Sequence, residues 1–158
     1  MKVLLIVWHS QFGGTAQMAA AARDGAATIE DVAVVYRAAA VAGVDDLLRC
    51  DALLVATSEN FGSLAGMTKD FFERVYYPCE HRVMGKPYAV LVCAGTDGTG
   101  ALFQTDRIAT GLKLRRVLPG LVHTSGVTAQ PHVVPPDVLA RCFEVGATLA
   151  AGLSAGIY

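Results

Sequence analysis

Five short apolar runs, separated by segments with helical spacing, constrain the fold of this chain more than any other feature. The runs carry no regular polar alternation, and they are Lys2 to Trp8, Asp31 to Arg37, Ala52 to Thr57, Tyr88 to Ala94 and Leu121 to Ser125. Such runs are typical of strands that are buried on both faces, as in a parallel sheet. We therefore predict a five-stranded parallel sheet.

The segments between the runs are predicted to be helices. They are Thr15 to Ala27, Val44 to Arg49, Gly66 to Val75, Ala101 to Val117 and a last helix that begins at Pro135-Pro136-Asp137. Arg115 and Arg116 are expected in the last turn of the fourth helix, where cations complement the helix dipole. Because strand and helix alternate throughout, we expect a doubly wound α/β/α sandwich of three layers, formed by a single domain of residues 1–158.

Charge and hydropathy narrow the class of partner. Lys and Arg total 13 against 14 for Asp and Glu, so the net charge of −1 gives no electrostatic reason to expect nucleic acid or an anionic membrane as partner. Apolar residues make up 53% of the chain, but their longest runs have strand length, well short of the ~20 residues that a membrane helix needs. We expect a soluble protein with a small-molecule partner.

The cysteines and the N-terminus predict a cytoplasmic location. The chain has four widely spaced cysteines without a C-x-x-C pair: Cys50, Cys79, Cys93 and Cys142. Neither a zinc site nor a redox dithiol is indicated, and free thiols suit the cytoplasm. The apolar run from Val3 to Trp8 is too short for the core of a signal peptide. The sequence offers no carboxylate or cysteine that forms an evident pair with His123 or His132. We therefore predict no metal site and no catalytic triad.

The loop after the first run has the composition of a phosphate site, and ligands of open parallel sheets bind beyond the carboxyl ends of the strands. Its residues are Ser10, Gln11, Phe12, Gly13, Gly14, Thr15 and Ala16, which lead directly into a helix. Glycines let the backbone approach a ligand, the hydroxyls donate, and the helix start presents N–H groups to an anion. Without a lysine or the G-x-G-x-x-G order, the loop favours a monophosphate. A capped, glycine-rich turn would have the same composition.

Two further loops at the same edge of the sheet are polar and rich in glycine. The loop after the third run extends from Thr57 to Gly66, and its ten residues exceed the about 2 to 6 of an ordinary connection. Its candidate ligand residues are Ser58, Glu59, Asn60, Phe61 and Gly62. The loop after the fourth run contributes Ala94, Gly95, Thr96, Asp97, Gly98 and Gly100. Its glycines allow backbone amides to face a ring or a sugar.

Together, the three loops resemble those of a known family. The segments S-x-x-G-G-T-A, T-S-E-N-F-G-S-L-A-G-M-T-K-D-F-F-E-R and A-G-T-D-G-T-G are similar to the flavodoxin-like NAD(P)H-dependent oxidoreductases. These include FMN reductases and the tryptophan-repressor-binding-protein type of quinone oxidoreductase. The resemblance implies a flavodoxin-like fold, FMN as cofactor and NAD(P)H as cosubstrate.

The resemblance also implies roles by position. Ser10 to Ala16 would hold the FMN phosphate, Glu59 to Gly62 would line the isoalloxazine ring, and Ala94 to Gly100 would cover its pyrimidine or dimethylbenzene side. The quinone reductases carry Pro and Arg where this chain has Ser58 and Asn60, and they contain an insertion associated with a tetramer. The resemblance therefore does not by itself imply quinone specificity or a tetramer. The related flavin reductases imply a homodimer instead, with the stretch from Val75 to Pro78 as its candidate contact.

The expected function is hydride transfer from NAD(P)H to bound FMN, and from there to a quinone, a flavin or a similar acceptor. The cofactor supplies the redox chemistry, so no side chain is assigned as catalytic acid or base. Two alternatives stay open: a flavodoxin-type electron carrier, for which near-neutral charge is unusual, and a flavin-free interaction module. A response regulator would need acidic residues where Trp8-His9 and Ala56-Thr57 stand. A hydrolase would need a G-x-S-x-G elbow directly after a strand, and none of the five apolar runs is followed by one, so the sequence favours neither class.

Several side chains near the predicted site have two interpretations. Phe61 either contacts the flavin or packs its loop onto the following helix, and Trp8 is expected in the core. Glu59 and Asp97 are the acidic groups nearest the expected ring, where negative charge lowers the flavin potential, unless they cap a loop or helix. His9 either binds phosphate or flavin or lies in solvent.

Overall fold

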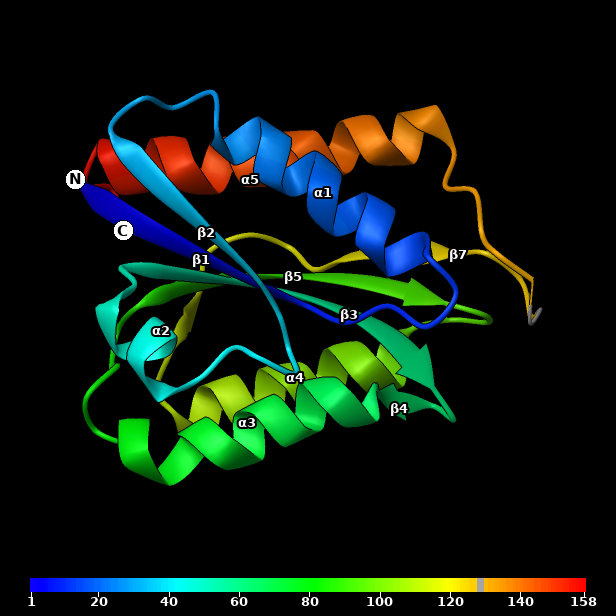
Figure 1. Cartoon of the computed structure of the whole chain (residues 1–158), viewed down its shortest axis with the longest axis horizontal. Helices are drawn as coiled ribbons and strands as arrows, with labels where there is room; N and C mark the ends of the chain where they lie inside the picture. Colours follow the sequence, from blue (N-terminus) through cyan, green and yellow to red (C-terminus); the bar gives the residue numbers. More distant parts are fainter. Residues whose placement is uncertain (128–129) are drawn as a thin grey trace.

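The computed structural model describes residues 1–127 and 130–158, in which strands and helices alternate along the chain (Figure 1). The elements are β1 (Lys2–Trp8), α1 (Gly14–Ala26), β2 (Val32–Ala38), α2 (Val44–Arg49), β3 (Ala52–Asn60), β4 (Ser63–Leu64), α3 (Gly66–Cys79), β5 (Pro87–Ala94), α4 (Thr99–Gly111), β6 (Arg115–Arg116), β7 (Leu121–Thr124) and α5 (Pro136–Ser154).

The main sheet is parallel, with the order β2-β1-β3-β5 and a fifth position beside β5. That position is shared by two short strands, because β6 pairs with the start of β5 and β7 with its end. The small strand β4 runs antiparallel to the end of β3 and lies off this path. The predicted doubly wound sheet with five parallel positions is therefore confirmed. Its strand order reverses between β1 and β3, where α/β proteins place their ligands.

Alternating side chains divide each strand between two apolar layers. In β1, Leu4 and Ile6 belong to the apolar cluster that includes α1 and α5, whereas Leu5 and Val7 belong to the one that includes α2, α3 and α4. Figure 1 shows α1 and α5 on one side of the sheet and α2, α3 and α4 on the other. All four side chains are fully buried. Burial on both faces explains why the strands are apolar without alternation, and it produces the three predicted layers.

Helices α1 and α5 approach each other so closely that glycine is required at the contact. A Cβ built on Gly146 of α5 would lie 1.8 Å from the carbonyl oxygen of Ala22, and one on Gly25 of α1 would lie 2.0 Å from that of Phe143. Backbone atoms of one helix therefore fill the space that a side chain of the other would need. This pair of helices covers one face of the sheet as a unit.

Three predicted helix or strand boundaries were wrong. Helix α4 ends at Gly111, and Lys113 adopts a left-handed conformation with φ 58°. Arg115 and Arg116 consequently form β6 beside β5 and do not lie in the last turn of a helix. Helix α3 continues to Cys79, and β3 continues to Asn60. The polar residues at the end of β3 thus belong to a strand.

The predicted dimer contact is only partly at the surface. Val75 is fully buried, whereas Tyr77 is 80% exposed. Of the stretch from Val75 to Pro78, only its outer residues can meet a partner, so a homodimer stays a prediction. Within the described residues, none of the helices is both long enough and apolar enough to cross a membrane.

Candidate functional site

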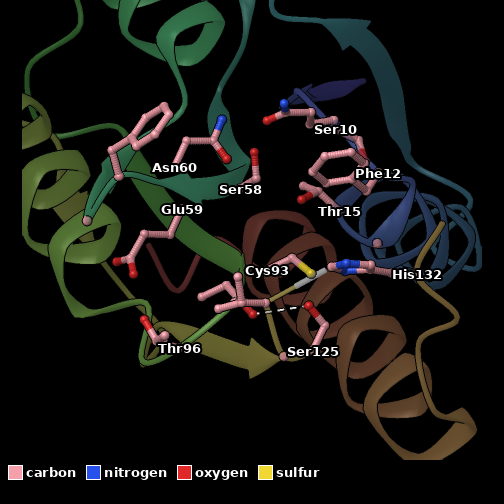
Figure 2. A pocket seen from close by; sticks show the side chains of 18 residues that line it. Ser10, Phe12, Thr15, Ser58, Glu59, Asn60, Cys93, Thr96, Ser125 and His132 are labelled. Carbon is pink, nitrogen blue, oxygen red and sulfur yellow. Dashed lines mark hydrogen bonds between the residues drawn. The ribbon is translucent and has the colours of Figure 1, made fainter. Parts of the chain in front are cut away.

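A cavity of about 420 Å³ lies at the carboxyl ends of the central strands. Its wall is formed by the ends of β3 and β5, by the start of α1 and by the segments that follow β1, β3, β5 and β7 (Figure 2). The described residues that line it are Ser10, Gln11, Phe12, Gly14, Thr15, Ser58, Glu59, Asn60, Phe61, Gly62, Cys93, Ala94, Gly95, Thr96, Ser125, Gly126, Val127 and His132. A volume of this size is within the range of about 300–1,000 Å³ of small-molecule and cofactor sites.

The structure brings the three predicted loops together around this cavity. The predicted residues that do not reach its wall are Gly13, Ala16, Asp97, Gly98 and Gly100. Two of them touch lining residues directly, because the N–H of Gly98 donates to Glu59 and Gly100 lies against the backbone of Gly62. The wall also contains residues that the sequence analysis did not assign, namely Cys93, Ser125, Gly126, Val127 and His132.

The first loop forms a cradle at the start of α1. Gly13 has φ 88°, a conformation that favours glycine, and its N–H donates to Ser10 Oγ (3.1 Å). A Cβ on Gly14 would lie 2.7 Å from Cys93 Sγ, so the backbone there rests directly on β5. Helix α1 has no side-chain cap and no acidic residue in its first turn. Its first N–H groups therefore lack acceptors within the helix and are suited to bind an anion.

The second loop is a β-hairpin with Phe61 and Gly62 at its tip. Glu59 and Asn60 of β3 pair with Leu64 and Ser63 of β4, which leaves a two-residue turn. Both turn residues have positive φ, 56° and 68°, as in the tight turn that suits the strand twist. The Phe61 side chain is fully exposed, so it does not pack the loop onto α3. It lines the mouth of the cavity instead.

Glu59 clamps this hairpin to the third loop. Its carboxylate accepts hydrogen bonds from the N–H groups of Gly98 (3.2 Å) and Ala101 (3.0 Å) at the start of α4. Ser63 Oγ donates to Gln104 Oε1 (2.7 Å) from the same hairpin. A Cβ on Gly100 would lie 1.9 Å from the carbonyl oxygen of Gly62. The hairpin therefore rests on α4 through side-chain hydrogen bonds and through direct backbone contact.

The two acidic residues near the site both serve as caps. Besides Glu59, Asp97 Oδ1 accepts hydrogen bonds from the N–H (2.8 Å) and the hydroxyl (2.7 Å) of Thr99. These hydrogen bonds hold the pKa of the Asp97 carboxyl below its ordinary value. Asp97 does not reach the wall of the cavity. Of the two interpretations for these carboxylates, capping is the one that has contacts in the structure.

Glu59 offers a direct test of the clamp. Because the Glu59→Ala change leaves two N–H groups at the start of α4 without their acceptor, we expect it to lower the free energy of unfolding by about 1–2 kcal/mol. Urea denaturation of the protein without added ligand measures this loss. Glu59→Gln retains one acceptor oxygen and should lose less. Unchanged stability in both variants would contradict the capping role.

The fourth wall of the cavity comes from the connection after β7. Ser125 N–H donates to the carbonyl oxygen of Ala94 (2.8 Å), and a Cβ on Gly95 would lie 3.2 Å from the Val127 side chain. This connection therefore lies against the loop after β5. From the sequence alone, the following segment, Gln130 to Pro136, is a Pro-rich, extended connection into the last helix, with room for a subunit contact but no predicted ligand role.

Burial shifts the pKa of two groups near the cavity, Cys93 and His9. Burial raises the pKa of the Cys93 thiol, although hydrogen bonds with Ser125 and Thr15 oppose that rise. Burial also lowers the pKa of His9, which does not line the cavity. None of the described lining residues is Lys or Arg. An anion in this cavity would therefore be held by neutral donors and by the dipole of α1.

Two buried polar atoms near the site have no hydrogen-bond partner among the described residues. They are Ser58 Oγ, on the wall of the cavity, and Trp8 Nε1, at the end of β1. The Trp8 ring stacks on Tyr36 with 5.4 Å between centroids and packs against the core, as expected for this residue. A buried hydroxyl without a partner is costly unless a ligand or water meets it.

Comparisons with known proteins agree with the resemblance of the loops. No protein-family model matches the chain. A protein named NAD(P)H dehydrogenase (quinone), from Acidithiobacillus ferrooxidans, is 27% identical over 121 residues, which are 63% of this chain and 60% of that protein. The match thus spans less than two thirds of the relative's length.

Solved structures with the same fold include flavodoxins. A flavodoxin from the domain Archaea has a TM-score of 0.80 at 18% identity and covers 96% of this chain and 99% of its own. A WrbA-like flavodoxin from Agrobacterium tumefaciens has a TM-score of 0.79 at 17% identity, covering 98% and 99%. The chain therefore has the flavodoxin-like α/β fold, and its sequence is similar to that of a quinone-type NAD(P)H dehydrogenase.

Proposed function

We propose that the chain is an FMN-binding, NAD(P)H-dependent oxidoreductase that reduces a quinone, a flavin or a similar small acceptor. The observation that carries this proposal is the cavity itself. An uncapped helix start lies at one end of it and the exposed Phe61 at its mouth. A cavity of this shape suits a ligand with a phosphate at one end and a flat apolar ring at the other.

The residues present fit FMN in three respects. The backbone at Gly14 and the N–H groups of α1 form a cradle for the phosphate, without side chains in the way. Ser58 Oγ is a buried hydroxyl that a ligand oxygen or nitrogen would satisfy. In the loop after β5, Gly95 and Thr96 bring backbone and hydroxyl groups to the wall of the cavity.

The protein's own contribution would be binding, orientation and exclusion of water. When bound, FMN would supply the hydride-transfer chemistry. Ser10, Gly14 and Thr15 would fix its phosphate end, and the hairpin tip at Phe61 would border its ring. The clamp of Glu59 on α4 keeps that hairpin in place. No side chain is required as acid or base in this scheme.

The first experiment is to record the visible spectrum of the purified protein during titration with FMN, followed by anaerobic addition of NADH or NADPH. We expect saturable binding and then rapid loss of the flavin absorbance. A protein that binds FMN without bleaching would instead support the alternative of a flavodoxin-type electron carrier. A protein that binds no FMN would contradict both the enzyme and the carrier.

A further inference from the structure

Hydrogen bonds from backbone atoms of the connection after β7 fasten it to the first loop and to a side chain of α1. The N–H of His132 donates to the carbonyl oxygen of Phe12 (2.9 Å), and Gln17 Nε2 donates to the carbonyl oxygen of His132 (2.6 Å). The N–H of Val134 completes the contact by donating to Gln17 Oε1 (3.1 Å). These bonds do not involve the imidazole of His132. The backbone at His132 is therefore held to Phe12 and to α1.

The imidazole itself lies at the start of α1. Its ring stacks on Phe12, with 5.9 Å between the centroids and 27° between the planes. His132 Nδ1 is 3.5 Å from the position of a Cβ on Gly14, the first residue of α1, and Cys93 Sγ is 2.7 Å from the same point. Figure 2 shows the His132 ring directed toward Cys93 on the side of the cavity where Phe12 and Thr15 lie. This is the end of the cavity that the phosphate would occupy.

The chemistry at this end leaves a role for an additional donor. The first turn of α1 offers backbone N–H groups without a capping side chain, and the described wall contains no Lys or Arg. Among the described lining residues, His132 alone has a side chain that can carry a positive charge. An imidazole has a ring N–H in either protonation state, and hydrogen bonds to phosphate oxygens are stronger than those between neutral groups.

We propose that His132 binds the 5′-phosphate of FMN and thereby makes the site distinguish FMN from riboflavin. The inference rests on the proposed function, because it assigns a ligand group to one end of the same cavity. His132 lies outside the three loops that carry the family resemblance. It would be a binding residue contributed by a fourth loop, in addition to the neutral donors of Ser10 and Thr15.

The test compares FMN and riboflavin titrations for the wild-type protein, His132→Ala and His132→Gln, each followed by flavin fluorescence. We expect His132→Ala to weaken FMN binding by about 10- to 100-fold, the equivalent of one hydrogen bond to a charged group, and riboflavin binding by less than about 2-fold. His132→Gln keeps an N–H donor and should recover part of the loss. Phe12→Leu is the matched control, since it removes the ring stack but retains the imidazole. It should affect both flavins equally.

The phosphorus-31 resonance of bound FMN gives a second readout that does not depend on riboflavin. We expect its chemical shift to move in His132→Ala and to stay in place in Phe61→Ala, because Phe61 belongs to the β3–β4 hairpin and not to the start of α1. Equal losses for FMN and riboflavin in His132→Ala, or an unmoved phosphorus resonance, would overturn the inference but leave the proposed function. A wild-type protein that binds no FMN would instead overturn the proposed function.

Discussion

Replacing Gly146 by alanine is expected to lower the free energy of unfolding by about 2 kcal/mol, because the new methyl group overpacks the contact between α1 and α5. Its carbon would lie 1.8 Å from the carbonyl oxygen of Ala22, which belongs to the backbone of α1 and cannot rotate away. In a helix without this contact, the same change would stabilise the protein by up to about 1 kcal/mol, since alanine has the higher helix propensity. The two effects have opposite signs, so the measurement is decisive.

Urea denaturation of the wild-type protein and Gly146→Ala measures this difference. Thr148→Ala is the control on the same helix, because Thr148 is exposed and its replacement should change stability by less than about 0.5 kcal/mol. Gly25→Ala should cost a similar amount, since its methyl group would meet the carbonyl of Phe143 at 2.0 Å. A Gly146→Ala protein as stable as the wild type would contradict the close backbone contact between α1 and α5.

The strands of the parallel sheet could be predicted because burial on both faces requires a run of consecutive apolar residues, which the sequence shows. Leu4, Leu5, Ile6 and Val7 are all fully buried, and four consecutive apolar residues are what a strand covered on both faces requires. The predicted boundaries failed where that signal ends. β3 continues through Ser58, Glu59 and Asn60, which are polar and line the cavity. Periodicity alone does not distinguish such a strand from a loop.

Local conformations that the residue type disfavours were also hidden from the sequence. Phe61 adopts positive φ at the hairpin tip, and Lys113 does so after α4, although neither residue favours that region. Tertiary contacts decide both cases: the Glu59 clamp holds the hairpin, and the N–H of Arg115 donates to the carbonyl oxygen of Lys86 in the sheet.

The candidate site was predictable in its loops but not in its fourth wall. Three loops could be assigned because each combines glycines and hydroxyls directly after a buried strand. His132 reaches the cavity through hydrogen bonds to Phe12 and to Gln17, which is 115 residues away in the sequence. A contact of that separation leaves no local pattern. The same holds for Cys93 and His132, which meet at Gly14 although nothing in the sequence relates them.

Gly100→Ala is expected to weaken FMN binding by roughly 10- to 100-fold, because its methyl group would lie 1.9 Å from the carbonyl oxygen of Gly62. This contact joins the backbone of α4 to the backbone of the hairpin, so neither partner can yield by a change of rotamer. The strain is relieved only when the hairpin leaves α4, which displaces Phe61 from the mouth of the cavity. We therefore expect a folded protein with a displaced ring site and slow bleaching by NAD(P)H.

Gly66→Ala provides the matched control for Gly100→Ala, since it adds the same methyl group at the start of α3, where no atom lies within 4 Å. It should bind FMN like the wild-type protein. Circular dichroism and urea denaturation separate loss of the site from loss of the fold. If Gly100→Ala binds FMN with unchanged affinity, the ring site does not depend on contact between the hairpin and α4, and the position proposed for the isoalloxazine ring is wrong. A selective loss of FMN binding would instead tie the hairpin, α4 and the cofactor into one structural unit.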